Sequence, residues 1–176
     1  FILAKRLSSK PPSGIDVKES SHDAALSKTA KLLQKEEVVI FEAAIKYQNC
    51  FIRIDILVKN GKSLHLIEVK AKSVDSKELP FLTKKGGYIS SKWDKYLFDV
   101  AFQKHVLQQA YPDMRAQSFL MLADKNTKCP TDGFNQKFKV VTGSNGRKHV
   151  EQHSPLNEQE LQNKILIQVP VDEYVQ

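Results

Sequence analysis

Alternation of apolar and polar positions predicts three consecutive strands in the first half of the chain. Residues 37–47 are apolar at almost every position, which is typical of a strand buried on both faces. Residues 51–58 and 64–70 alternate with a period of two, and Asn60-Gly61 between them is a strong signal for a hairpin turn. We therefore expect an antiparallel meander in which the middle strand pairs with both of its neighbours.

Apolar spacing near 3.6 residues predicts two helices beside this meander. Residues 21–36 carry an apolar stripe behind a serine cap, and residues 93–111 carry a longer stripe that Pro112 ends. The apolar run at residues 119–122 predicts a further core strand, which a crossover through the second helix can bring into the same sheet. The pattern therefore predicts an α/β fold, a three-layer α/β/α sandwich with a central mixed β-sheet and helices on both sides.

The remaining segments divide the chain into an arm and one domain. Residues 1–20 are rich in basic, Pro, Ser and Gly residues and are predicted as a basic N-terminal arm or linker. Residues 21–176 then form a single domain, which is the number expected for a chain of this length. Near its end, residues 138–141 and 165–169 are expected as short strands separated by a polar stretch.

Side-chain parity on the hairpin places charged residues together. If Asn60 and Gly61 are the two loop residues, Asp55 and Glu68 are diagonal neighbours on one face, and Lys70 lies one step further along that face. Two carboxylates within reach of one ion suit Mg²⁺, which takes oxygen ligands, and a lysine beside it could orient or deprotonate a water. The alternative is a surface hairpin in which Arg53 and Lys70 only neutralise the two carboxylates.

These residues carry a resemblance to a known family. Asp55, followed after a hairpin by Glu68-Val69-Lys70, resembles the PD-(D/E)XK nuclease superfamily, and the surrounding residues are most similar to its RecB-like exonuclease branch. The resemblance spans roughly residues 24 to 112. It implies a restriction-endonuclease-like fold and hydrolysis of DNA phosphodiester bonds with Mg²⁺ or Mn²⁺. Asp55 and Glu68 would hold the metal, and Lys70 would assist the attacking water.

The same resemblance implies further site residues. Glu42 occupies the place of an acidic residue on the preceding strand, the carbonyl of Val69 would be a metal ligand, and Gln103 would position the metal site or the substrate. The chain has Leu107 where the family usually has an aromatic residue, and His22 precedes the predicted helix that often carries a metal-binding histidine. Glu42 could instead be a paired or snorkelling glutamate, Gln103 a boundary residue of the helix, and His22 a solvent-exposed histidine.

Charge adds a class of partner. The net charge of +7 and the pI near 9.3 favour an anionic partner, with nucleic acid first and a membrane surface second. Lysines alternate with aromatic residues in the loop after the hairpin. We expect the lysines to neutralise phosphates and the aromatic rings to stack on bases. The alternative is an ordinary exposed loop. The predicted nucleic-acid contacts are Lys72, Lys84, Lys85, Lys92 and Trp93.

The two cysteines and the hydropathy of the chain indicate in which cellular compartment the protein is expected. Cys50 and Cys129 lie in unrelated contexts and suggest neither a disulfide framework nor a zinc site, so a reducing, cytoplasmic location is expected. No apolar run approaches the ~20 residues of a membrane span. Because position 1 is Phe rather than Met, the chain is expected to be a piece of a longer protein that could carry additional domains.

Three classes of function remain open at this point. The first is an active DNA nuclease, and the second is a nuclease-like module that binds nucleic acid without cutting it. The third is a protein unrelated to nucleic acid, whose charged residues form only structural pairs. The intact set of Asp55, Glu68 and Lys70 favours the first class. The pattern does not separate exonuclease from endonuclease, or single strands and ends from duplex DNA.

Overall fold

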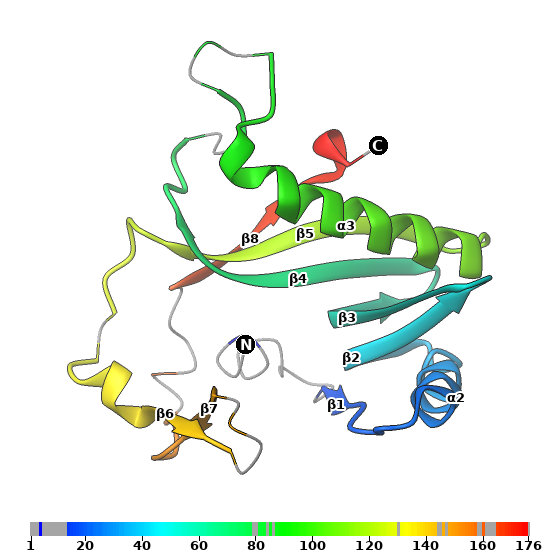
Figure 1. The fold of residues 1–176 in the computed structure, drawn as a ribbon, viewed down its shortest axis with the longest axis horizontal. Helices are drawn as coiled ribbons and strands as arrows, with labels where there is room; N and C mark the ends of the chain where they lie inside the picture. The colour runs from blue at the N-terminus through cyan, green and yellow to red at the C-terminus, as the bar shows by residue number, and fades with distance from the viewer. Residues whose placement is uncertain are drawn as a thin grey trace.

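The computed structural model of the chain is built on one mixed β-sheet (Figure 1). The structure describes residues 4, 14–78, 81–83, 85, 87–129, 131–143, 146, 148–157, 160 and 165–175. Six strands lie in the order β1-β2-β3-β4-β5-β8. Their bounds are β1 Ile15–Asp16, β2 Glu37–Tyr47, β3 Cys50–Asn60, β4 Ser63–Val74, β5 Arg115–Asp124 and β8 Leu166–Pro170.

The strand directions confirm the predicted topology. β2, β3 and β4 form the antiparallel meander, β5 pairs parallel to β4 after the crossover, and β8 runs antiparallel to β5 at the edge. The prediction of an α/β fold with a central mixed sheet is therefore confirmed. β1 pairs parallel with β2 at the opposite edge, so the described end of the predicted N-terminal arm belongs to the main sheet.

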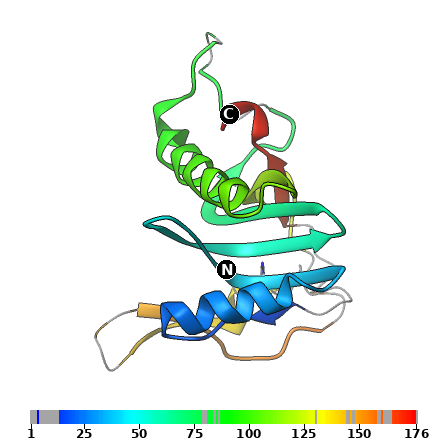
Figure 2. The same ribbon diagram turned by 90° about the vertical axis from the view of Figure 1, so that its right-hand side faces the viewer.

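Two helices cover the larger core. α2 (His22–Leu32) lies along β2. α3 (Ser91–Ala110), which connects β4 to β5 in the sequence, lies across the sheet and contacts β2, β3 and β5 (Figures 1 and 2). Thr29 of α2 is fully buried and accepts the N–H of Ala44 at 3.0 Å. Both helices contribute to the same cluster of buried apolar residues. The prediction of helices on both sides of the sheet is therefore not confirmed within the described residues.

The turn between β3 and β4 lies one residue later than predicted, which shifts the pairing register by two residues. Asn60 pairs with Ser63, so Gly61 and Lys62 form the turn. Lys59 consequently faces Leu64 instead of Lys62, and its ammonium group donates to the carbonyls of residues 35 and 36, in the turn that follows α2, at 2.7 and 3.3 Å. This register avoids a like-charge pair and lets the buried lysine supply a donor to carbonyls of the turn between α2 and β2. The shift is even, so the residues of β4 keep their predicted faces.

Alternation in β2 and β3 breaks at Glu42 and Asp55, which the register places opposite each other. Phe41 and Ile56 belong to a second, smaller cluster, whereas Ala43 and Ile54 belong to the larger one. Residues two apart on a regular strand share a face, so both strands switch faces here. Glu42 has a φ of +57°, and this left-handed backbone accounts for the switch in β2. The period-two alternation predicted for residues 51–58 therefore does not hold through the whole of β3, because Ile54 and Ile56 belong to different clusters.

The segment after β5 forms a small separate sheet. A 3-10 helix, η1 (Phe134–Lys137), leads into the antiparallel pair β6 (Phe138–Thr142) and β7 (Lys148–Gln152). Figure 1 shows this pair apart from the six-stranded sheet. β6 was predicted, and β7 lies in a stretch predicted as a polar loop. A second 3-10 helix, η2 (Asp172–Tyr174), follows β8. In the described part of the chain, no helix combines the length and apolar character that crossing a membrane requires.

Candidate functional site

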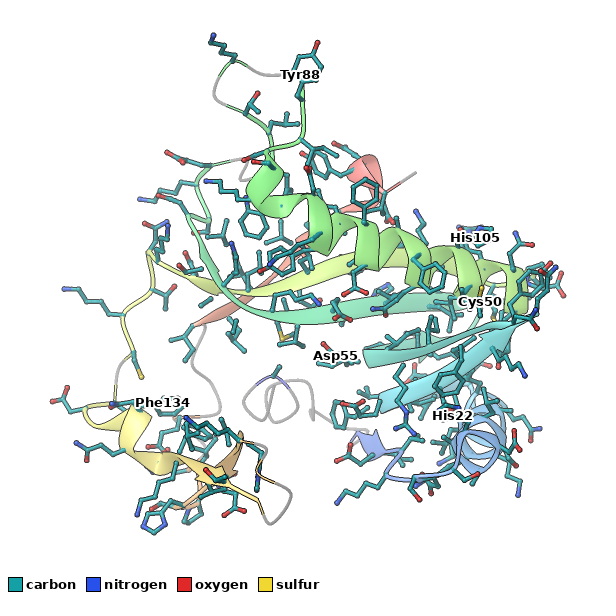
Figure 3. The ribbon with its side chains drawn as sticks, in the orientation of Figure 1. His22, Cys50, Asp55, Tyr88, His105 and Phe134 are labelled. Carbon is teal, nitrogen blue, oxygen red and sulfur yellow. The ribbon has the colours of Figure 1, made fainter. Side chains whose placement is uncertain are left out.

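The candidate site lies where β3 and β4 separate. Their ladder runs from the turn to the pair of Ile56 and Ile67. Beyond this pair, β3 continues against β2 and β4 continues against β5. Asp55 is the first β3 residue past the ladder (labelled in Figure 3), and its Oδ2 accepts the N–H of Val69 at 2.8 Å. The Asp55 side chain thus accepts a hydrogen bond from the Val69 amide, which no backbone carbonyl of β3 reaches at this point. It also places a carboxylate in the opening between β3 and β4.

Glu68 faces α3 from the opposite side of this opening. It continues the face of Leu64 and Leu66, and it is 7% exposed. Its Oε2 accepts a hydrogen bond from Nε2 of Gln103 at 2.9 Å. The glutamine is itself 5% exposed, and its Oε1 is buried without a partner among the described residues. The structure therefore brings together Glu68 and Gln103, two of the candidate site residues, and leaves one buried acceptor beside them.

Lys70 lies between two carboxylates. Its ammonium group donates to Glu68 Oε1 and to Asp99 Oδ2, each at 2.7 Å. Asp99 also accepts from Gln103 at 3.2 Å, which joins four side chains in one network. Sequence analysis missed Asp99. Its signal was present, because Asp99 precedes Gln103 by four residues and therefore lies on the same side of the helix.

The electrostatics of this network are uneven. Burial raises the pKa of Glu68, and the nearby Asp55 carboxylate raises it further, against the hydrogen bonds from Lys70 and Gln103. Burial likewise raises the pKa of Asp55, although the Val69 N–H opposes the effect. Burial alone would lower the pKa of Lys70, but its bonds to Asp99 and Glu68 outweigh burial and raise the pKa to about 12. The site therefore holds repelling carboxylates beside one firmly protonated lysine.

Glu42 adds a third carboxylate at this position. It lies opposite Asp55, and its negative charge raises the pKa of Asp55. With Asp99, four acidic groups beside one lysine leave negative charge that a cation can neutralise. The left-handed backbone at Glu42 coincides with this cluster, as strained residues often do at functional sites.

The carboxylates of Asp55 and Glu68 suit a hard divalent cation whose other ligands are water or substrate oxygens. Mg²⁺ is often held by one or two carboxylates together with waters and substrate phosphates. Asp55 and Glu68 can supply two such carboxylates, since an ionised carboxylate can accept more bonds than those they already make. No group of three or more His, Cys, Asp or Glu residues suited to a metal ion is found in the described ranges. Metal ligation by Asp55, Glu68, Glu42 and the Val69 carbonyl stays a prediction.

The pairing proposed as a purely structural alternative is only half present. Lys70 does pair with Glu68. Arg53 instead donates to the backbone carbonyls of Val17 and Glu19, at 3.3 and 2.7 Å, and anchors the segment after β1. His22 is the first residue of α2 and stacks on Phe51, with ring centroids 4.1 Å apart. Neither Arg53 nor His22 joins the network around Glu68.

The residues predicted to contact nucleic acid differ in their exposure to solvent. Lys85 and Lys92 are exposed, and Lys84 lies outside the described residues. Trp93 is 4% exposed and packs edge-on against Phe81, so the exposed ring expected there is not found. Lys72 lies over the Trp93 ring with its Nζ 5.5 Å from the centroid. Trp93 therefore supports a lysine from the core and does not offer a free face to a base.

Comparisons with known proteins add no relative. No protein-family model, no curated protein and no solved structure matches the chain. What the site can do is therefore argued from its residues and their geometry.

Proposed function

We propose that this chain is a metal-dependent nuclease that hydrolyses phosphodiester bonds of DNA. The observation that carries the proposal is the convergence of Asp55, Glu68 and Lys70 at the opening between β3 and β4, with Gln103 and Asp99 of α3 beside them. Membership of the PD-(D/E)XK superfamily and a restriction-endonuclease-like fold belong to this proposal. The order of meander, crossover helix and parallel strand supports them.

Each side chain of the network has a role in this proposal. Asp55 and Glu68 would hold Mg²⁺ or Mn²⁺, which when bound supplies a Lewis acid for the phosphate and lowers the pKa of a bound water. Lys70, with its pKa near 12, stays protonated and therefore donates hydrogen bonds to the phosphate or the attacking water instead of accepting a proton. Gln103 holds the Glu68 carboxylate in place.

A second candidate is a nucleic-acid-binding module that does not cut. The observation that favours it is the pair of short contacts from Lys70 to Glu68 and Asp99, which engage the lysine within the protein. In this candidate the network is structural, and the positive net charge supplies salt-dependent affinity for the phosphate backbone.

Cleavage of labelled single- and double-stranded DNA tests the proposal. Wild type and Lys70→Ala are compared with Mg²⁺, with Mn²⁺ and with EDTA, and Lys139→Ala, which removes an exposed lysine of β6, is the matched control. We expect metal-dependent cleavage that Lys70→Ala lowers about 100-fold or more and Lys139→Ala leaves unchanged.

The other outcomes decide between the candidates. DNA binding without cleavage under every condition would refute the nuclease and leave the binding module. Absence of both binding and cleavage would refute the two together. The sizes of the products would separate an exonuclease from an endonuclease.

A further inference from the structure

Three ammonium groups gather around one aromatic ring beside the candidate site. The Nζ atoms of Lys70, Lys72 and Lys95 lie 5.7, 5.2 and 5.0 Å from the centroid of the Tyr96 ring. Each distance is within the range of a cation–π contact. Lys72 and Lys95 come from β4 and α3, so the sheet and the helix both contribute to this cluster.

Only one of these three charges is neutralised by a nearby carboxylate. Lys70 pairs with Glu68 and Asp99. Among the described residues, neither Lys72 nor Lys95 forms an ion pair, and Lys95 is exposed. Like charges held close together repel each other, and an anion between or above them would relieve that repulsion. The position between Lys72 and Lys95 therefore suits a phosphate of the strand adjacent to the phosphate that would be cut at Asp55 and Glu68.

Two exposed phenylalanines continue this surface along α3. Phe98 is 72% exposed and Phe102 is 49% exposed, and their spacing of four residues places them one turn apart on the outer side of the helix. Each directly precedes a member of the site network, Asp99 and Gln103 respectively. Large aromatic rings exposed to water cost free energy that a flat ligand would recover by covering them.

We propose that Lys72, Lys95, Tyr96, Phe98 and Phe102, here called the α3 strip, bind unpaired nucleotides of the substrate strand. The inference rests on the proposed nuclease function and adds the substrate class. The lysines neutralise phosphates, and the phenylalanine rings stack on bases. Stacking needs a free base face, and a duplex hides the faces of its bases within the helix. The strip therefore selects a strand that is single-stranded beside the bond to be cut.

Binding measured without catalysis tests the strip. Fluorescence anisotropy in EDTA compares a labelled oligonucleotide as a single strand and as a duplex, with wild type and with the Phe98→Ala/Phe102→Ala variant. The matched control is Val140→Ala/Val150→Ala, which removes two exposed apolar side chains of the β6–β7 sheet. We expect tighter binding of the single strand by wild type, and a loss of about tenfold or more in the phenylalanine variant only.

Two further variants separate the sources of affinity. Phe98→Leu/Phe102→Leu keeps apolar surface but removes the rings, and it should bind as weakly as the alanine variant. Lys95→Ala should weaken binding of the single strand and reduce its dependence on salt, because one phosphate contact is lost.

Several results would overturn the strip. Equal affinity for single strand and duplex, or full affinity in the phenylalanine variant, would refute binding of unpaired nucleotides by the α3 strip. If cleavage that depends on Lys70 were still observed, the proposed nuclease function would remain supported. A dimer of wild type that Phe98→Ala/Phe102→Ala dissolves would assign the two rings to a protein interface instead. Neither binding nor cleavage by wild type would refute the nuclease and the strip together.

Discussion

At the scale of single residues, Glu42 joins backbone strain to a carboxylate. Its φ of +57° lies in the left-handed region, which costs a residue other than glycine about 1–2 kcal/mol. The surrounding strand pairs continue on both sides of it, so the fold imposes this conformation. Its position opposite Asp55 ties the strain to the candidate site.

The strain and the carboxylate can be separated by two substitutions. Glu42→Gly should raise the free energy of unfolding by about 0.5–1 kcal/mol, because glycine adopts this backbone readily but loses more entropy on folding. Glu42→Ala removes the same carboxylate and keeps the strain, so it is the control. Urea denaturation measures both variants, and a glycine variant no more stable than the alanine variant would contradict the assignment of strain. If Glu42 serves the site, both variants should lose cleavage activity.

Lys70 is expected to act through its positive charge. Its pKa of about 12 exceeds the usual 10.5, so the stability it contributes is complete below the lower value and is lost as pH rises towards the higher one. Lys70→Arg keeps a charge, although in a different shape, and should retain more single-turnover cleavage activity than Lys70→Ala. Equal inactivity of the two variants, with binding intact, would argue against a role for charge alone.

At the scale of elements, the β3–β4 turn and the turn that follows α2 hold each other in place. Lys59 donates to the carbonyls of residues 35 and 36, and the N–H of Gly61 donates to the carbonyl of Glu36 at 3.0 Å. The buried lysine is thus explained by the turn between α2 and β2 that it caps, and its place in the hairpin register follows.

Removal of this cap should loosen both elements. Lys59→Met keeps the buried aliphatic chain but leaves the carbonyl of Lys35 without the donor that Lys59 supplies, and should lower the free energy of unfolding by about 1–3 kcal/mol. Lys62→Met, at the neighbouring turn position, should change it little. Thermal and urea unfolding followed by circular dichroism measure the difference. Equal stability of the two variants would show that the cap contributes nothing.

At the scale of the whole molecule, the crowded carboxylates set a dependence of stability on pH. Burial and the Glu42 charge raise the pKa of Asp55, so the folded chain binds more protons than the unfolded chain at pH values between the unfolded and folded pKa. Stability contributed by Asp55 is therefore present at low pH and falls as pH rises through that window. A cation held by these carboxylates, as proposed above, would offset this cost.

Asp55→Asn should remove that cost while keeping an acceptor for the Val69 N–H. In EDTA near neutral pH the variant should melt at a higher temperature than wild type, and the difference should shrink as pH falls towards the usual 3.8 of an aspartate. Added Mg²⁺ should raise the melting temperature of wild type only. A wild type that is more stable than the variant in EDTA at every pH would contradict the proposed repulsion.

The sequence by itself determined the local elements and much of the network. A continuous apolar run located β2, and period-two alternation located β3 and β4. The long apolar stripe located α3 within two residues of its observed start at Ser91. Parity placed Glu68 and Lys70 on one face, because an even shift in register does not change the face of a residue. These features depend on spacing along one element, which a sequence contains directly.

Only the tertiary structure decided how those elements meet. The face switch at Glu42 and Asp55, the cap that Lys59 places on the turn after α2 and the salt bridge from Lys70 to Asp99 all join residues that lie far apart in the sequence. The burial of Trp93 depends in the same way on Phe81 and the helix around it. Long-range packing and electrostatics choose among conformations that are locally equivalent. For that reason the spacing of residues predicted Glu68, Lys70 and Gln103 as candidates but neither Asp99 nor the hydrogen bonds that connect the four.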